Sequence, residues 1–497
     1  MNNIVNFVDD LLKMNVTRII GVLGSGDSLK IIEKFLENGG EFVGIPHEFS
    51  APVIASAVNK FGEGKNFAAS ISIRGPGLAS SIPGLYYNYM EDLKSLSISE
   101  SLNNDEARFN KHKLLDATDA LRSIGFNKSL VQNSQNSFDS DSKDNISQRM
   151  LHLFTRSETR LVYARTESEM CNNQAIKRQL EKKKKYFVFG KRGVENLEVQ
   201  SYLLPIVPFF LTPAALPYVD LTAPNYLGVW TGNEQFKDSF YSKKIFASSI
   251  IIRVGVMKRE LLTLKENYEH LDLSMINGID KISLNDLMGD NLNSVNDELK
   301  YFNEFKKSIS NRSGGWSVYS MIDVINNLNY NHSITFDVGS FATVIENYLK
   351  PRDKFSLHSS FISKFMGTAV ATAIGACIAK TSTPGICILG EGGFSASYND
   401  LSIIAALQLP ICILVLTDNS MNSIIGKTYK KSYKDKISLP LNYNVLKSSN
   451  MSQIPSYCIK SSNEFELKID QWDKKSPIIF FLEFNPDYYV KGVKLLR

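Results

Sequence analysis

The chain has 497 residues, which is enough for two to four domains of ordinary size. It is 43% hydrophobic and 22% charged, as globular proteins are, and its net charge of +5 is too small for a dedicated nucleic-acid binder. Five cysteines without CxxC spacing indicate free thiols in a reducing compartment. We find neither a signal peptide nor an apolar stretch long enough to span a membrane. We therefore expect a cytoplasmic protein.

The first part of the chain, for which we set bounds of 1–166, alternates strand and helix signals. Predicted strands cover 18–23, 41–45, 67–73 and 94–99, and predicted helices cover 29–36 and 51–58, with a further helix opening at Gly75-Pro76-Gly77. This alternation predicts a parallel sheet. Beyond it we expect a loose surface connection at 127–147, a helix at 146–154 and a last strand at 160–164.

Glu48 stands out because it lies between a predicted buried strand and a predicted buried helix. A charged group at such a place costs free energy unless it is paired or used. The alternative is a glutamate in the first turn of a helix, where the helix dipole favours an acid. Taken alone, the residue does not decide between these two interpretations.

A lysine-rich linker at 181–185 leads into a middle domain, for which we set bounds of 180–290. Strands are predicted at 186–190, 203–211, 226–232 and 250–255. No Gly-rich dinucleotide fingerprint is present, so we do not expect FAD, and a structural spacer is the favoured interpretation. Residues 281–315 are charged and Asn-rich and are predicted to form a linker plus a helix.

The last domain, with bounds of 310–497, contains a run of small residues at 367–376 that predicts a helix packed closely on a sheet. A strand is predicted at 385–389, a helix at 398–408 and a second strand at 411–416. This βαβ unit places both strand ends at the edge of a parallel sheet where ligands bind.

Both of these strand ends carry an acid. Glu391 follows the first strand within a Gly-rich turn, and Asp418 follows the second. Oxygen ligands beside a turn that admits a phosphate describe a Mg²⁺–diphosphate site. The alternative is that Glu391 is a solvated turn residue and Asp418 a helix N-cap, and this segment alone leaves both open.

The stretch from Gly390 to Ser420 resembles the diphosphate-binding motif of thiamine-diphosphate enzymes, which begins Gly-Asp-Gly and ends in two asparagines. The match includes Phe394 and the pair Asp400-Leu401. Two positions depart from the motif: Glu391 replaces the usual aspartate, and Thr417-Asp418 stands where Asn-Asn is usual. Both replacements keep an oxygen at the metal position.

Two N-terminal segments resemble motifs of the same family, and they occur in the family's order. Pro46–Ala51 resembles the His-Glu-x-x-Ala segment that carries the activating glutamate, here Glu48. Gly75-Pro76-Gly77 resembles the Gly-Pro-Gly loop that follows it, with Ser80 where the family often has Asn. Three matches in the right order are far more specific than any one of them.

The resemblance implies the site residues. The metal ligands would be Glu391, Asp418 and the backbone carbonyl of Ser420, with Asn419 replacing Asp418 in an alternative register. Met366 falls where the family places the large residue that props the cofactor into a bent shape, although a Met is more often core filler. The residues that would bind the cofactor are Gly75, Gly339, Ser340, Met366, Gly390, Gly392, Gly393, Phe394, Asn419 and Met421.

The family is the acetolactate synthase, pyruvate oxidase and 2-oxo acid decarboxylase group. It implies an α/β fold with three doubly wound parallel-sheet domains: the thiamine-diphosphate-binding fold twice, with a Rossmann-like domain between. It also implies that thiamine diphosphate and Mg²⁺ serve decarboxylation of a 2-oxo acid, here followed by carboligation to a second carbonyl. A simple decarboxylase, a cofactor-free regulatory homologue and an FAD-using redox member are the alternatives. In this family the site lies between two subunits, so we expect a homodimer or a dimer of dimers in which Glu48 serves a cofactor held by the partner copy.

Overall fold

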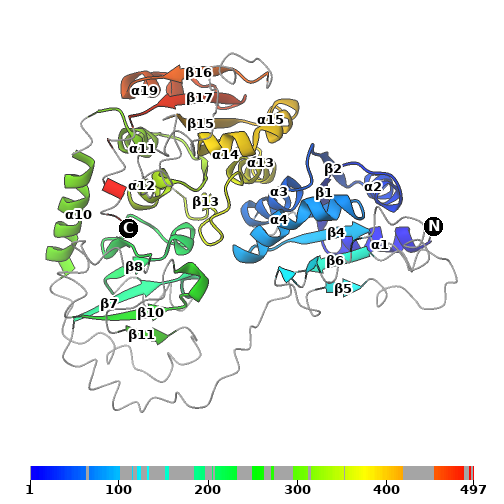
Figure 1. Cartoon of the computed structure of the whole chain (residues 1–497), viewed down its shortest axis with the longest axis horizontal. Coiled ribbons are helices and arrows are strands. Elements are labelled where there is room, and N and C mark those ends of the chain that lie inside the picture. Colours follow the sequence, from blue (N-terminus) through cyan, green and yellow to red (C-terminus); the bar gives the residue numbers. More distant parts are fainter. Residues whose placement is uncertain are drawn as a thin grey trace, which may run out of the picture.

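The structure is a computed structural model, and its strands form three sheets among the residues it describes (Figure 1). The described residues are 2–62, 67–100, 115, 120–121, 123–124, 131–133, 151–155, 184–195, 204, 207–231, 249–261, 270–273, 295–311, 315–351, 353–417, 453–485, 488, 492–493 and 496. The α/β fold class is confirmed. The domain boundaries stay predictions.

The first sheet has the strand order β2-β1-β3-β4-β6-β5. Its parallel strands are β1 (Val16–Gly21), β2 (Glu41–Gly44), β3 (Phe67–Ser72) and β4 (Leu96–Glu100). Its helices are α1 (Asn2–Lys13), α2 (Asp27–Glu37), α3 (Ser50–Phe61) and α4 (Pro76–Met90). Apolar residues of α1, α2 and the strands form a core on one side of this sheet, and α3 contributes to a core that continues into the last domain.

The edge of this sheet differs from the sequence prediction. The predicted helix at 146–154 is wrong, because β6 (Leu151–Thr155) is a strand that pairs antiparallel with β4. The predicted connection at 127–147 contains a short strand, β5 (Val131–Asn133), antiparallel to β6. The free edge of β4 explains the difference, since a strand's unpaired N–H and C=O groups favour an added strand. The strand predicted at 160–164 lies outside the described residues.

The middle sheet is parallel in every pairing that the structure describes, with the order β11-β10-β7-β8-β9. Its strands are β7 (Lys184–Phe189), β8 (Phe209–Leu211), β9 (Tyr226–Val229), β10 (Ser249–Val254) and β11 (His270–Leu273). The short helix α8 (Lys191–Val194) follows β7 at once. A sheet whose first strand lies at the centre has its topological switch point there, between β7 and β10.

The last sheet is also parallel among described pairs, with the order β13-β12-β14-β15-β17-β16. Its strands are β12 (Ser333–Phe336), β13 (Leu357–Ser359), β14 (Gly385–Gly390), β15 (Ile411–Thr417), β16 (Ser456–Ile459) and β17 (Ile478–Glu483). Its helices include α11 (Val318–Asn327), α12 (Ser340–Tyr348), α13 (Ala369–Ala379), α15 (Leu401–Ala406) and α19 (Ser462–Gln471), and α10 (Val295–Asn311) precedes them. Strands β14 and β15 are almost wholly buried, as their apolar runs predict.

The Gly-rich segment after β14 is a short helix, α14 (Glu391–Ala396), and not the turn that we predicted. A 3₁₀ turn (Tyr398–Asp400) and α15 follow it, where the sequence predicted one helix at 398–408. The strand–helix–strand order of the segment is nevertheless as predicted.

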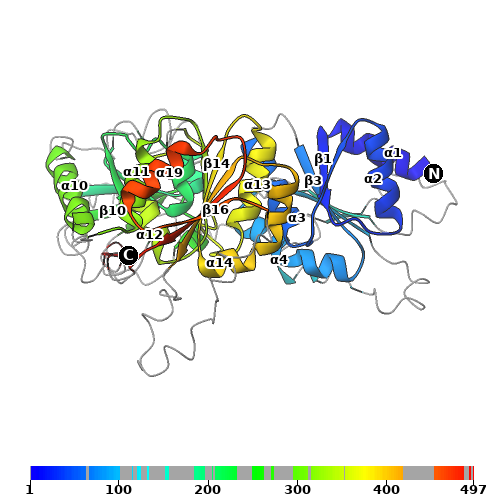
Figure 2. The same ribbon diagram turned by 90° about the horizontal axis from the view of Figure 1, so that it is seen from above.

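The first and last domains pack through α3 and α13, which lie side by side in both ribbon views (Figures 1 and 2). Small residues allow the close approach. A Cβ on Gly375 would lie 2.5 Å from the Cβ of Ala57 and 2.5 Å from the carbonyl oxygen of Ile54. One apolar cluster runs across both domains, so they share a buried core within the chain.

Within the described part of the chain, no helix combines the length and the apolarity that crossing a bilayer requires.

Candidate functional site

Glu48 lies in the bend between β2 and α3, where its carboxylate faces the Gly75–Gly77 loop. Its Oε1 is 3.3 Å from the place that a Cβ on Gly77 would occupy. Gly75 has φ 66°, a conformation that favours glycine, and α4 begins directly after it. The structure therefore brings together the two N-terminal motifs, and Glu48 is half-buried between them.

The segment around Glu48 contacts the last domain of the same chain. Phe49 stacks on Phe365 with the ring centroids 6.2 Å apart. The hydroxyl of Ser50 donates to the Asp400 carboxylate over 2.8 Å, and burial raises the pKa of Asp400 to about 6 while this hydrogen bond lowers it. The two residues that follow Glu48 thus both contact the last domain of the same chain.

The carboxyl ends of β12 and β14 meet around Phe341. A Cβ on Gly339 would lie 2.4 Å from Cε1 of Phe341, and a Cβ on Gly390 would lie 3.4 Å from the same atom. Ser340, the first residue of α12, is buried beside them. These three predicted cofactor residues therefore come together at one edge of the sheet.

Asp337 is the central residue of this edge; its segment resembles the family's Asp-x-Gly segment, but we did not predict it as a site residue. It is fully buried at the end of β12, and its Oδ2 accepts the backbone N–H of Gly367 over 2.7 Å. A Cβ on Gly393 would lie 2.1 Å from the same Oδ2, so only glycine fits there. Burial raises the pKa of Asp337 to about 7, and backbone hydrogen bonds from Gly367, Val338 and Thr368 oppose that rise. An acid ending a buried strand was the signal that could have identified it.

Glu391 is buried at the start of α14, next to half-buried Gly392. Phe394 packs in the core, with ring centroids 5.7 Å from Phe481 and 5.9 Å from Tyr398. Met366 is 41% exposed and precedes Gly367, whose φ is 86°. It is therefore not core filler in this chain.

Four of the predicted residues lie outside the described part of the structure: Asp418, Asn419, Ser420 and Met421. Among the described residues, no group of three or more His, Cys, Asp and Glu side chains forms a metal-binding cluster. The metal ligand set therefore stays a prediction.

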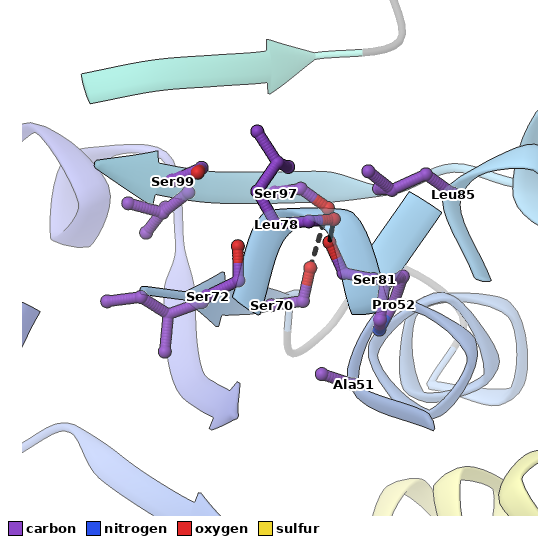
Figure 3. Close-up of a pocket in the computed structure, with 11 residues that line it drawn as sticks. Ala51, Pro52, Ser70, Ser72, Leu78, Ser81, Leu85, Ser97 and Ser99 are labelled. Atoms are coloured by element: carbon purple, nitrogen blue, oxygen red, sulfur yellow. Dashed lines mark hydrogen bonds between the residues drawn. The ribbon is translucent and has the colours of Figure 1, made fainter. Parts of the chain in front are cut away.

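A separate pocket lies in the first domain between α3, α4, β3 and β4, and serines dominate its lining (Figure 3). The hydroxyls of Ser70 and Ser97 are hydrogen-bonded to each other over 2.6 Å, and the Ser81 hydroxyl donates to the carbonyl of Leu78 over 2.8 Å. None of the predicted cofactor residues lines this pocket, so it is not part of the candidate site.

Comparison with known families gives matches at both ends of the chain. The N-terminal TPP-binding domain of thiamine pyrophosphate enzymes matches residues 4–122, and the C-terminal TPP-binding domain matches residues 337–479. Together the two matches cover more than half of the chain. The chain belongs to the thiamine pyrophosphate enzyme family.

Individual relatives are similar over shorter stretches. A probable acetolactate synthase large subunit of Methanococcus aeolicus is 33% identical over 109 residues, which are 22% of this chain and 18% of the relative. An acetolactate synthase of Bacillus subtilis (strain 168) is 28% identical over 99 residues, which are 20% of this chain and 17% of the relative. An acetolactate synthase large subunit of Pyropia yezoensis is 30% identical over 113 residues, which are 23% of this chain and 19% of the relative. The chain thus matches about a fifth of the length of these curated relatives.

Proposed function

We propose that the chain binds thiamine diphosphate with Mg²⁺ and uses it to decarboxylate a 2-oxo acid and join the product to a second carbonyl compound. The observation that carries the proposal is that Glu48 faces the Gly75–Gly77 loop, while its neighbour Phe49 stacks on Phe365, the residue before Met366. Membership of the family supports the cofactor, and similarity to acetolactate synthases supports the carboligation.

The described residues fit the diphosphate end of this cofactor. Gly339, Gly390 and Gly393 lie at the ends of β12 and β14, where glycine allows close packing against Phe341 and Asp337 and leaves the backbone N–H groups without a side chain beside them. Oδ1 of Asp337 is buried without a hydrogen-bond partner among the described residues, and a metal ion or a hydrogen-bond donor of the bound cofactor would satisfy it. Glu391 would bind the metal ion together with Asp418, or Asn419 in the alternative register, and the carbonyl of Ser420.

When bound, thiamine diphosphate supplies the nucleophilic carbon and the electron sink for decarboxylation. Glu48 would hydrogen-bond N1′ of the aminopyrimidine and hold a proton there; its carboxylate lies beside Gly77, where a side chain would crowd it. The rings of Tyr86, Tyr87 and Phe49, each within 6.4 Å of Phe365 by centroids, surround this region with apolar surface. A low dielectric strengthens the hydrogen bond of the carboxylate. Met366 would support the bent shape of the cofactor.

Two other functions remain as outcomes of the test. A simple decarboxylase would release an aldehyde, but the sequence has no adjacent pair of histidines such as pyruvate-type decarboxylases carry. A non-catalytic homologue would have no physical need for the carboxylate at residue 48. A screen of 2-oxo acids for CO₂ release, with and without an aldehyde or a second 2-oxo acid as acceptor, separates carboligation from aldehyde release.

We further propose that the protein is a homodimer or a dimer of dimers, with Glu48 of one copy serving a cofactor held by Glu391 of another. The contacts of α3 with α13 lie within one chain here. In the proposed oligomer, the first domain of one copy makes these contacts with the last domain of another.

Binding is tested by calorimetric titration of the protein with thiamine diphosphate at millimolar Mg²⁺, together with thermal unfolding. We expect heat of binding and a higher melting temperature, since a ligand that binds only the folded state stabilises it. Neither heat nor thermal stabilisation at millimolar cofactor would contradict the proposal.

A further inference from the structure

The C-terminal end of α4 is capped by two cations from the middle domain. Lys191 Nζ donates to the carbonyl oxygens of Glu91 over 2.9 Å and Asp92 over 2.8 Å. Arg259 donates to the carbonyl of Tyr89 over 3.2 Å and lies 3.5 Å from the Asp92 carboxylate. The last carbonyls of a helix have no partners within it, and cations there also interact favourably with the helix dipole. The middle domain therefore fixes the end of α4.

Glu91, at the same helix end, holds a loop of the last domain. Its carboxylate accepts the backbone N–H of Ile362 over 3.0 Å and that of Ser363 over 2.7 Å, with the Ser363 hydroxyl as a third donor. Glu91 is only 4% exposed, and its burial raises its pKa while these hydrogen bonds and Lys191 lower it. Three domains therefore meet at Glu91.

The loop that Glu91 holds leads directly to the candidate site. Phe365 closes the loop with a backbone N–H bonded to the Ser360 hydroxyl and contacts Phe49 beside Glu48. Met366 follows, and Gly367 bonds to Asp337. A displacement at Ile362 and Ser363 would thus move the residue that supports the cofactor.

The backbone of Lys191 is also fixed by hydrogen bonding within the middle domain. Its backbone N–H donates to Glu260 over 3.2 Å, and Glu260 also accepts the Thr212 hydroxyl. The place is the switch point of the middle sheet, where open α/β sheets bind ligands. In this chain the backbone of α8 packs directly against the segment at the end of β10 and fills the switch point. A Cβ on Gly193 would lie 2.3 Å from the carbonyl oxygen of Val254, and one on Gly190 would lie 2.4 Å from Cα of Val256. Lys191 reaches from it to the first domain.

We propose that Lys191 and Arg259 are positioning residues for the candidate site, acting through Glu91 on the loop Ser360–Phe365. The middle domain is then a clamp that sets the geometry of the cofactor pocket, not the passive spacer that we predicted. That Lys191 influences the position of the loop is inferred from the described hydrogen bonds. That this position affects catalysis rests on the proposed function.

The test compares Lys191→Met with Lys191→Arg and with Lys475→Met, a matched change at an exposed lysine of the last domain. Hydrogen exchange of backbone amides, measured by mass spectrometry without cofactor, reports on the loop itself. We expect the amides of 360–366 to exchange about tenfold faster in Lys191→Met, because a charged hydrogen-bonding group is lost from the helix end that orients Glu91. Lys191→Arg should restore much of the protection, and Lys475→Met should leave it unchanged.

Two results would overturn the proposal. In one, the amides of 360–366 exchange in Lys191→Met as slowly as in the unaltered protein. In the other, they are accelerated no more than amides in the rest of the chain. Should Lys191→Met fail to fold, Arg259→Met tests the same helix end, because it removes the hydrogen bond to the Tyr89 carbonyl and the ion pair with Asp92 but leaves Lys191 in place. A second arm measures the rate at which the C2 proton of thiamine diphosphate exchanges with solvent at saturating cofactor. If Lys191 positions the site, the C2 proton should exchange at least about fivefold more slowly in Lys191→Met than in the unaltered protein. If Lys191 only stabilises the fold, the exchange rate should be the same in both at a temperature where the variant is folded. If the cofactor does not bind at all, the proposed function is wrong. The hydrogen-exchange measurement without cofactor still tests whether Lys191 positions the loop.

Discussion

Gly393 lies against Asp337 so closely that any side chain at residue 393 would collide with the carboxylate: a Cβ would lie 2.1 Å from Oδ2. The contact joins α14 to the end of β12. The same oxygen accepts the N–H of Gly367. Asp337 therefore connects the segment expected to bind the diphosphate with the segment expected to support the bent cofactor.

Gly393→Ala should destabilise the fold by about 1–3 kcal/mol, because the new methyl group forces a shift of buried Asp337 or of α14. It should also weaken cofactor binding. Urea unfolding measures the first effect. Gly44→Ala is the control, since its Cβ would meet its nearest neighbouring atom only at 3.6 Å. Equal stability of the two variants would mean that the approach of Gly393 to Asp337 does not constrain the site.

Glu391→Ala should weaken Mg²⁺-dependent cofactor binding by about tenfold or more, because it removes a proposed metal ligand. Titration calorimetry at fixed Mg²⁺ measures the change. Glu304→Ala, at an exposed position on α10, serves as the control. Unchanged affinity in Glu391→Ala would place the metal site elsewhere.

The strands that build the site were predictable because their signal is local. The apolar runs of β14 and β15 and the glycines at the motif positions need no knowledge of the rest of the fold. Strand β6 was missed because its pairing with β4 is a contact between segments far apart in the sequence. The contact of Gly393 with Asp337 is likewise non-local, and the sequence did not show that the Gly-rich segment forms a helix instead of a turn. An acid at the end of a predicted strand marks Asp337 in the sequence, but its contacts with Gly367 and Gly393 are tertiary and could not be predicted. The same is true of the capping of α4 by Lys191.

The burial of Asp400 should make stability depend on pH. Burial raises the pKa of Asp400 to about 6 in the folded protein, above its ordinary value of 3.8. The folded state therefore holds a proton that the unfolded state has lost between these values, and this contribution is present below pH 4 and lost as pH rises through about 6. Asp400→Asn should reduce the pH-dependent part of the unfolding free energy by up to about 3 kcal/mol.

Urea unfolding at pH 4.5 and pH 7.5 measures this difference. Asp353→Asn, at an exposed position, should leave the pH dependence as it is. If Asp400→Asn and the unaltered protein lost the same stability between the two pH values, Asp400 would not hold a proton in the folded state.

Sharing of the site between copies predicts complementation. An equal mixture of Glu48→Gln and Glu391→Ala chains, unfolded and refolded together, should regain about a quarter of the activity of the unaltered protein, since half of the dimers are mixed and each contains one intact site. Each variant refolded alone is the control. No recovery, despite subunit exchange shown by differently tagged chains, would mean that Glu48 serves the Glu391 of its own chain, as the contacts of Phe49 with Phe365 permit.

The central claim is that Glu48 activates a thiamine diphosphate molecule bound by this chain. The most direct measurement is the rate at which deuterium from solvent replaces the C2 proton of thiamine diphosphate, followed by NMR at saturating cofactor and Mg²⁺, because it needs no knowledge of the substrate. We predict exchange far faster than for free cofactor, and a rate lower by about a hundredfold or more in Glu48→Gln with cofactor affinity largely retained. Exchange no faster than for free cofactor, or equal rates in the unaltered protein and Glu48→Gln, would contradict the account.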